Sequence, residues 1–194
     1  MMQELVQSIK DNAQKAVEGI HTAVPAVIVS YDTSTGKAVV QPKALYKKPD
    51  GKKIDYPQIT GVPVVFPQSQ SVTIAFPIKP NDACLLICSE TPIDYWLYGK
   101  ETETDLKFDL SNAIAIPNIC VTGNSAMQTA CAENATVVQA GGTILKVTPS
   151  NVTVIGSIVV SGSITASGDV VGKGVSLSGH IHTGDSGGKT SPPL

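Results

Sequence analysis

A glycine recurs every six residues near the C-terminal end of the chain, at Gly156, Gly162, Gly168 and Gly174. Between these glycines Val, Ile and Ala occupy alternate positions, and the intervening positions carry mostly Ser, Thr and Asp. Alternation with a period of two is the pattern of a β-strand with one apolar face, and regularly spaced glycines are typical of turns between stacked short strands. The pattern predicts a slender shaft of stacked strands.

This aliphatic row is too narrow to be buried by one chain, because no large side chain accompanies it. All nine aromatic residues lie at or before Phe108, whereas 12 of the 17 glycines lie after it. Three copies wound about one axis are the smallest arrangement that buries each row against two others. We therefore expect a cyclic homotrimer with an aliphatic interior and a Ser- and Thr-rich, nearly neutral exterior.

The part of the chain before the shaft alternates between strands and turns, without a convincing crossover helix. Closing such a small sheet removes its exposed edges, so we expect a small β-barrel. Lysines flank Pro49-Asp50-Gly51, which indicates a solvated hairpin tip. The expected strands are Ala26–Tyr31, Lys37–Leu45, Ile54–Phe66, Ser71–Ile78 and Ala83–Ser89.

Residues 2–20 place apolar side chains at helical spacing, which predicts one short amphipathic helix ending near Gly19. Its apolar face can pack on its own domain, on a sister chain or on a partner, and the spacing does not rank these. The expected organisation is an N-terminal helix at 1–21, a barrel domain at 22–117, a shaft at 118–177 and a metal-binding tip at 178–194.

Composition excludes several classes of protein. A net charge of −2 without any arginine argues against a nucleic-acid partner. No apolar run approaches the roughly 18–20 residues of a membrane span, and the N-terminus lacks the pattern of a secretory signal, so we expect a chain made and kept soluble.

The four cysteines, Cys84, Cys88, Cys120 and Cys131, match no common zinc spacing. Cys84 and Cys88 alternate with Leu86 on one face of an apolar strand. Free cysteine behaves as a small hydrophobic residue in such a place. We expect these two to be buried thiols.

Two histidines, His180 and His182, lie one residue apart near the C-terminus. Side chains at i and i+2 of a strand point to the same face, so in a trimer six imidazoles would surround one axis, provided that a bulge or turn near Gly172-Lys173-Gly174 resets the alternation. Six nitrogen donors suit an octahedral metal such as Fe(II) or Ni(II) better than four-coordinate zinc. We expect a structural metal site with no open position for a substrate.

Two enzymatic interpretations compete for the same segment. Gly184-Asp185-Ser186-Gly187-Gly188 resembles the nucleophile segment of trypsin-like proteases, but only six residues follow it. His180, His182 and Asp185 have the composition of a two-histidine, one-carboxylate iron oxygenase site, but no pocket-forming residues lie nearby in the sequence. We expect a protein that is not an enzyme.

A binding interpretation concerns Trp96 with Tyr95 and Tyr98, which can stack on a ligand. The competing expectation is that this aromatic cluster belongs to the core of the barrel. A trimeric adhesin or tail-fibre segment that binds glycans through the barrel is therefore the alternative function.

Several segments resemble the central spike of contractile phage tails, in particular the lysozyme-free spikes of the Mu type. Asn81-Asp82, Ser89-Glu90, Asp94-Tyr95-Trp96-Leu97 and Asp109–Pro117 are similar to the end of the spike's oligosaccharide-binding-fold (OB) domain, and Ser178-Gly179-His180-Ile181-His182 with Thr190-Ser191-Pro192-Pro193 resembles its needle tip.

The resemblance implies an all-β fold in which an OB-fold-like small barrel precedes an intertwined trimeric β-helix needle. It implies one iron ion per trimer, octahedral, held by His180 and His182 of each chain. It also implies a place at the baseplate tip of the virion, with the tail hub and tube proteins as partners. The implied action is mechanical piercing of the host outer membrane.

Overall fold

The computed structural model describes residues 2–48, 51–100, 105–118, 122–184 and 186–191. The chain divides into two compact units, Met1–Thr122 and Gly123–Leu194. The fold is mostly β, with a short N-terminal helix, as the sequence predicts.

The N-terminal helix α1 spans Met2–Glu18, and none of its residues is buried. Its last turn ends at Gly19, whose backbone N–H donates to the carbonyl of Lys15. Two residues further on, the His21 N–H donates to the Phe108 carbonyl at 2.8 Å, and the His21 ring packs edge-on against Tyr56. The chain is thus fixed to the first unit immediately after the helix.

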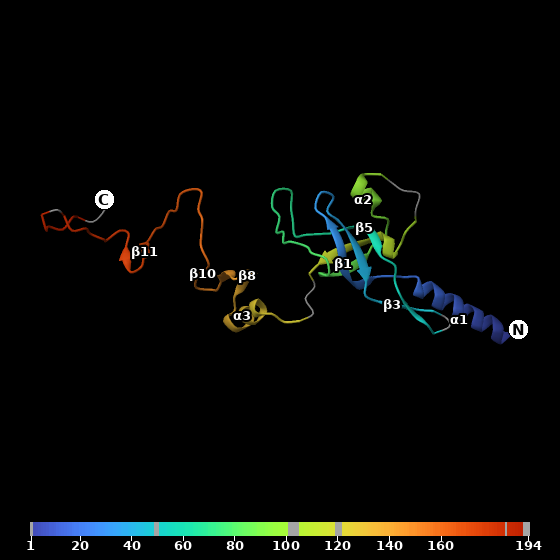
Figure 1. Cartoon of the computed structure of the whole chain (residues 1–194). Helices are drawn as coiled ribbons and strands as arrows, with labels where there is room; N and C mark the ends of the chain where they lie inside the picture. The colour runs from blue at the N-terminus through green and yellow to red at the C-terminus, as the bar shows by residue number, and fades with distance from the viewer. Residues whose placement is uncertain (1, 49–50, 101–104, 119–121, 185, 192–194) are drawn as a thin grey trace. The chain divides into compact units, whose positions relative to one another are not determined.

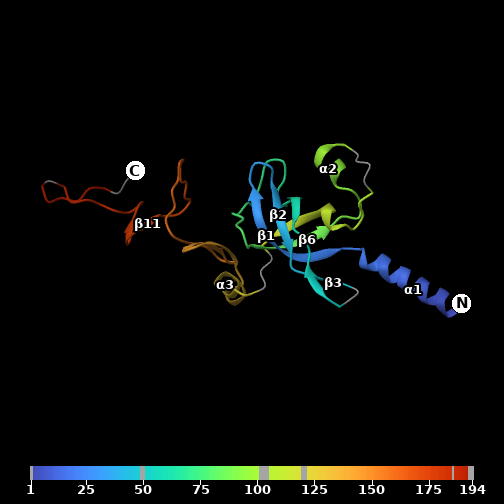
Figure 2. The ribbon, with the colours of Figure 1, turned by 45° about the vertical axis from the view of Figure 1, so that its right-hand side comes forward.

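A five-stranded antiparallel sheet forms the body of the first unit, in the order β5-β2-β1-β6-β7. Irregularities in the β1–β2 and β2–β5 registers increase its twist, and the sheet curls into a half-barrel (Figures 1 and 2). Val64, just after β5, bridges Ala115 of β7, so the two edges meet at one point. The closed barrel expected from the sequence is observed in this more open form. The strands are β1 Ala23–Asp32, β2 Lys37–Pro42, β5 Ile59–Pro63, β6 Ala83–Cys88 and β7 Ala113–Pro117.

The core lies inside this curl and contains no aromatic residue among its buried members. Buried and partly buried residues alternate along β2 and β6, as expected for strands with one face inward. Small residues dominate, which lets a short sheet curl tightly around its own interior. The buried hydrophobic residues are Ala26, Ile28, Ala38, Val40, Val62, Cys84, Leu86, Cys88, Ala113 and Ala115.

The expected burial of Cys84 and Cys88 is confirmed, because their exposed fractions are 0% and 5%. Burial raises the pKa of the Cys84 thiol to about 11, and burial followed by the charge of Asp109 raises that of Cys88. At pH 8 a thiol of that pKa is ionised in about one molecule in a thousand, and the thiolate is the reactive form.

A maleimide reagent at pH 8 is therefore expected to modify Cys84 at least about a hundredfold more slowly in the folded protein than in guanidinium chloride, and to modify Cys88 more slowly as well. Mass spectrometry of proteolytic peptides measures each site separately. Cys131, exposed on α3 (Ser125–Glu133), is the internal comparison. Equal labelling of Cys84 and Cys131 in the folded protein would contradict the burial.

One expected strand is absent. Residues 71–78 form no strand, and the local structure is a tight turn in which Ser69 N–H donates to the Val72 carbonyl and Gln68 bridges Thr73. Proline at 67 and 77 removes donors on both sides, so the segment folds back on itself instead of joining the sheet. By contrast, the hairpin around residue 51 is confirmed by the pairing of β3 (Leu45–Lys47) with β4 (Lys53–Asp55), although Pro49 and Asp50 lie outside the described residues.

Among the described residues of the first unit, Asn112 is the buried polar residue, with an exposed fraction of 2%. It ends the 3-10 turn η1 (Leu110–Asn112). Its Oδ1 accepts from the Ile93 N–H at 3.0 Å, and its Nδ2 donates to the carbonyls of Thr91 at 2.8 Å and Leu106 at 3.0 Å, with a longer contact to Ser89. One side chain therefore holds together the loops between β6 and β7.

Asp109 caps η1 by accepting from the backbone N–H of Ser111 at 2.7 Å, and it also accepts from the Ser111 hydroxyl. These hydrogen bonds, aided by the nearby His21, lower the pKa of the Asp109 carboxyl. A carboxyl whose pKa is lower in the folded state stabilises the fold above its unfolded pKa, near 4, and this contribution disappears as the pH falls through the folded pKa.

Asp109→Asn is therefore expected to lose less stability than the parent protein when the pH falls from about 5 to 2. Urea unfolding at a series of pH values measures the difference. The matched control is Asp105→Asn, on an exposed carboxylate that pairs with Lys107. If Asp105→Asn flattened the pH profile as much as Asp109→Asn, the capping account would be wrong.

The second unit begins with the helix α3, within the range where only strands were expected. Asn124 caps it by accepting from the Met127 N–H, and Asn134 ends it in the left-handed conformation. A three-stranded antiparallel sheet follows in the order β10-β9-β8, and then a two-stranded hairpin. The strands are β8 Thr136–Ala140, β9 Thr143–Val147, β10 Val152–Ile155, β11 Val171–Gly172 and β12 Val175–Ser176.

Residues 156–170 form no strand in the single chain, although they carry most of the glycine-periodic repeat. A β-helix needle is therefore not formed by one chain alone. The physical reason is that a strand needs a hydrogen-bonded neighbour, and between β10 and β11 one chain supplies none.

Candidate metal site at the C-terminal tip

The two histidines of the tip lie side by side. The ring centroids of His180 and His182 are 5.0 Å apart, with the rings nearly perpendicular at 84°. The pair is not part of a regular strand, yet the i, i+2 spacing brings the side chains together as the sequence predicts. Their role as metal ligands stays a prediction.

The expected turn before the histidines is present. β11 and β12 pair as a tight hairpin, and Lys173 and Gly174 at its turn have φ of 51° and 81°. Glycine tolerates such a positive φ without strain, whereas Lys173 adopts it at some cost. This turn interrupts the alternation of the repeat just ahead of the tip.

Asp169 fastens the chain that leads from this hairpin into the tip. Its Oδ1 accepts from the Ser178 hydroxyl at 2.8 Å and from the Ser178 N–H at 3.1 Å. Hydrogen bonds from Ser176 and Ser178 lower the pKa of the Asp169 carboxyl, so it stays ionised at neutral pH. The backbone two residues before His180 is therefore held in place by hydrogen bonds.

The ring of His180 is oriented by backbone carbonyls. Its Nδ1 lies 2.9 Å from the Ser176 oxygen and 3.0 Å from the Leu177 oxygen. A carbonyl oxygen can only accept, so Nδ1 carries the hydrogen, and in the neutral ring the lone pair is then on Nε2. A carbonyl that accepts from one ring nitrogen while the other is free to bind is the usual arrangement around a metal-ligating histidine.

The segment after His182 folds back on it. The His182 N–H donates to the Thr190 hydroxyl at 2.8 Å, and the Thr190 N–H donates to the His182 carbonyl at 2.9 Å. Thr183 bridges Lys189, and Gly184 N–H donates to the Gly188 carbonyl at 2.6 Å. The segment that resembled a protease elbow is thus a reversing loop, and Asp185 within it lies outside the described residues.

The described residues of one chain supply too few ligands for a metal ion. Among the residues that the structure describes, no group of three or more His, Cys, Asp or Glu side chains comes together. The tip offers two imidazoles, and in one of them, His180, the lone pair of Nε2 is available to bind a metal ion. These two imidazoles would fit iron if other copies of the chain contributed the same pair, which is the six-imidazole arrangement expected from the sequence.

The repeat before the tip leaves its aliphatic side chains exposed in the single chain. In the alternating row Ile164 is 75% exposed, Ile158 68% and Val152 63%. An extended segment with so many exposed Val and Ile side chains has an apolar surface that a monomer in water does not cover. The same row includes Val154, Val160 and Val170, which are 36–46% exposed, and the aliphatic residues at intervening positions, Val159, Val171, Val175 and Leu177, are 55–93% exposed.

The aromatic cluster of the first unit lies on the surface. Tyr95, Trp96 and Tyr98 belong to the five-residue helix α2 (Asp94–Tyr98) and are 64%, 65% and 55% exposed. The expectation that they would form part of the core is wrong. The short helix places them outside the curled sheet, whose interior is filled by small residues.

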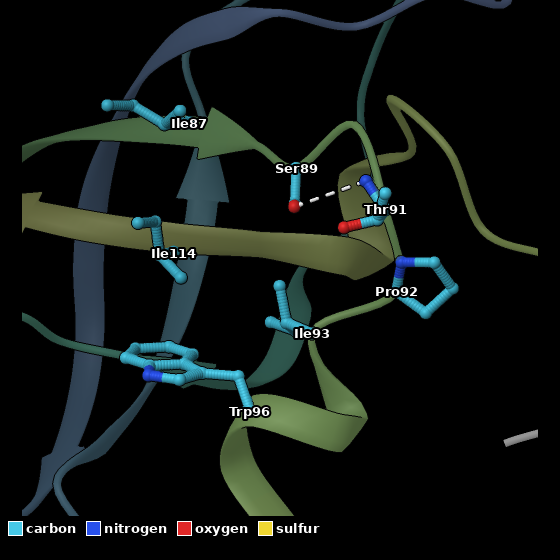
Figure 3. Close-up of a pocket in the computed structure, with 7 residues that line it drawn as sticks. All are labelled: Ile87, Ser89, Thr91, Pro92, Ile93, Trp96 and Ile114. Atoms are coloured by element: carbon cyan, nitrogen blue, oxygen red, sulfur yellow. Dashed lines mark hydrogen bonds between the residues drawn. The ribbon is translucent and has the colours of Figure 1, made fainter. Parts of the chain in front are cut away.

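Trp96 borders a shallow hollow of about 340 Å³ on the outer side of β6 and β7 (Figure 3). Ile87, Ile93 and Ile114 form its apolar wall, and the Trp96 ring turns toward Ile114. Ser89 and Thr91 place hydroxyl groups at one end. The hollow thus combines an exposed aromatic face with hydrogen-bonding groups.

Comparison with known proteins bears on the first unit. Residues 24–118 match the family model "Phage protein Gp138 N-terminal domain". The matched range covers just under half of the chain and coincides with the curled sheet and the loops around it. This similarity supports a structural phage protein of the baseplate type and a component of the virion. The tip histidines lie outside the match.

No curated protein matches the chain. Among the described residues, none of the helices combines the length and the apolar character needed to cross a membrane.

Proposed function

We propose that this protein is the envelope-piercing spike at the tip of a contractile phage tail or a related injection particle. In this proposal three copies form one rigid spike, whose OB-fold-like barrel mounts on the tail hub and tube and whose C-terminal end meets the host outer membrane. The protein acts mechanically and is not an enzyme.

The observation that carries this proposal is the exposed aliphatic row of residues 152–177 that leads to a paired-histidine tip. Three copies wound about one axis would bury each row against two others, at roughly 25 cal/mol for each Å² of apolar surface removed from water. Residues 156–170 would gain strand partners from neighbouring copies. Their backbone N–H and C=O groups would then form inter-strand hydrogen bonds, and the three chains would form an intertwined β-helix.

The tip of such a trimer would hold one iron ion through His180 and His182 of each copy. The six imidazoles of these two positions would bind such an ion together and would join three chain ends where fraying would begin. The carbonyls of Ser176 and Leu177 fix the His180 ring with its Nε2 free, and the Thr190 contacts hold the His182 backbone. A saturated site has no position for a substrate, which fits a structural role.

Two properties of the proposed trimer would suit it to piercing. A shaft with inter-strand hydrogen bonds along its whole length would resist bending, and a tip whose three chain ends bind one metal ion would resist unravelling under load. The similarity of residues 24–118 to a phage domain supports a tail location.

Gold labelling of purified particles tests the location, with the expected result of one labelled site at the tip of the tail baseplate. Label along the tail sheath or on the head would contradict the proposal. Particles carrying His180→Ala/His182→Ala are expected to adsorb to cells normally and to infect them less efficiently.

A second candidate function rests on the hollow beside Trp96. Sugar rings stack their C–H faces on exposed aromatic rings and hydrogen-bond to nearby hydroxyls, and the hollow offers Trp96 with Ser89 and Thr91. In this case the chain would be a trimeric adhesin or tail-fibre segment.

A glycan array probed with the parent protein, Trp96→Ala and Tyr95→Ala separates the two functions. Tyr95 is equally exposed but does not line the hollow. Binding lost only in Trp96→Ala supports the adhesin. A parent protein that binds no glycan leaves the spike as the better proposal.

A further inference from the structure

The N-terminal helix carries a heptad pattern that its own chain does not use. Within α1 the side chains Met2, Val6, Ile9, Ala13 and Ala16 follow each other at spacings of four, three, four and three. This is the a/d repeat of a coiled coil, with Val6 and Ala13 at a and Met2, Ile9 and Ala16 at d. We call these five residues the α1 seam.

The opposite side of the helix repeats with the same period. Glu4, Asp11 and Glu18 are seven residues apart and occupy the outermost heptad position. Gln7 donates to Asp11 at 2.7 Å and Gln14 to Glu18 at 3.1 Å, each four residues apart on this side. The acidic and amide side chains therefore line one side of the helix, and the apolar seam lies on the opposite side.

The first unit does not cover the seam. No residue of α1 is buried, and Met2, Val6 and Ile9 are 81%, 47% and 59% exposed. A 17-residue helix without tertiary packing is only marginally stable in water, because most helix stability in proteins comes from a buried apolar face. The seam therefore needs an occupant.

We infer that the occupants are the α1 helices of other copies, packed as a parallel three-helix coiled coil. β-Branched residues at both an a position, Val6, and a d position, Ile9, favour three strands over two. Ala13 and Ala16 allow close approach at the other end of the seam.

The charge of α1 favours other copies of the helix over a membrane surface as its partner. Helices that lie on membranes carry Lys or Arg on the polar side, whereas α1 has two lysines against three acidic residues, a net charge of −1. The acidic row opposite the seam would face lipid headgroups unfavourably.

This inference rests on the homotrimer of the proposed function. A trimer held together by residues 152–177 would raise the local concentration of α1 greatly, so even a short coiled coil would form. In a cyclic trimer the three N-termini lie at the same end, which makes the helices parallel.

Disulfide crosslinking of the full chain tests the inference in a Cys120→Ser/Cys131→Ser background. Ile9→Cys and Val6→Cys place thiols on the seam, and Asp11→Cys places one on the outer side. Seam thiols in a parallel coiled coil come within disulfide reach, whereas outer ones do not. After mild oxidation we expect at least about fivefold more linked dimer from each seam variant, up to roughly two of every three chains.

Light scattering of the same unoxidised samples separates this inference from the proposed function. A trimer in which seam and outer variants crosslink equally or not at all would overturn the coiled coil and leave the spike intact; α1 would then bind a different protein. A monomer would overturn both. Circular dichroism of each variant checks that helix content is retained, and two seam positions guard against one disruptive substitution.

Discussion

Replacing Asn112 with alanine is expected to lower the free energy of unfolding of the first unit by about 3 kcal/mol. The side chain is 98% buried and bonds the Ile93 N–H and the carbonyls of Thr91 and Leu106. Truncation leaves these backbone groups without partners in a place that water reaches poorly, and each such group costs about 1–3 kcal/mol. The cost exceeds that of losing one ordinary surface hydrogen bond.

Guanidinium unfolding followed by the fluorescence of Trp96, the single tryptophan of the chain, measures this effect. The matched control is Asn12→Ala on the exposed side of α1, for which we expect a change within about 0.5 kcal/mol. Asn112→Asp is informative as well, because it keeps the acceptor for Ile93 but directs a carboxylate at two carbonyls. A cost for Asn112→Ala no larger than for Asn12→Ala would show that the loops hold without this side chain.

Replacing both tip histidines, as His180→Ala/His182→Ala, is expected to reduce bound iron more than tenfold. All six proposed donors come from these two positions, so no partial ligand set remains. Metal binding to a site that the unfolded chain lacks also stabilises the fold, so thermal unfolding of the tip is expected at lower temperature.

Inductively coupled plasma mass spectrometry of the purified double variant measures the metal content. His21→Ala is the matched control, since His21 is the third histidine of the chain and packs against Tyr56. It is expected to retain all of the iron. Iron retained in the double variant, or lost in His21→Ala, would show that the metal binds somewhere other than the tip.

The parts of the fold that sequence predicts well are those governed by one local rule. Alternation along Lys37–Pro42 and Ala83–Cys88 identifies the inward face of the sheet, since the period of two leaves a strand little choice. The α1 helix follows from its apolar spacing. The glycines around Lys173 mark the turn that precedes the histidines.

The parts that sequence misses depend on short or long-range features. α2 has five residues, too few for any periodicity, so Trp96 was expected in the core and is on the surface. The caps Asn124 and Asn134 were the available signals for α3, which lies within a region otherwise rich in strand-forming residues. Nothing in the sequence singles out Asn112, because its four partners lie 6 to 23 residues before it and no short-range pattern links them to it.

At the tip, too, the sequence predicts only part of the arrangement. The spacing of His180 and His182 predicts that the rings lie together, which the 5.0 Å separation confirms. The carbonyls that orient His180 could not be predicted, because they depend on the turn at 173–174 and on the Asp169 contacts. The proposed metal site, which several chains would share, would be incomplete in any one of them.

The most direct test of the central claim combines elemental analysis with mass in solution on the same sample of the full chain. We predict one iron ion for every three chains in a particle of three times 20.2 kDa. A monomer of 20.2 kDa would contradict the spike altogether. A trimer without metal would contradict the assignment of His180 and His182 as ligands.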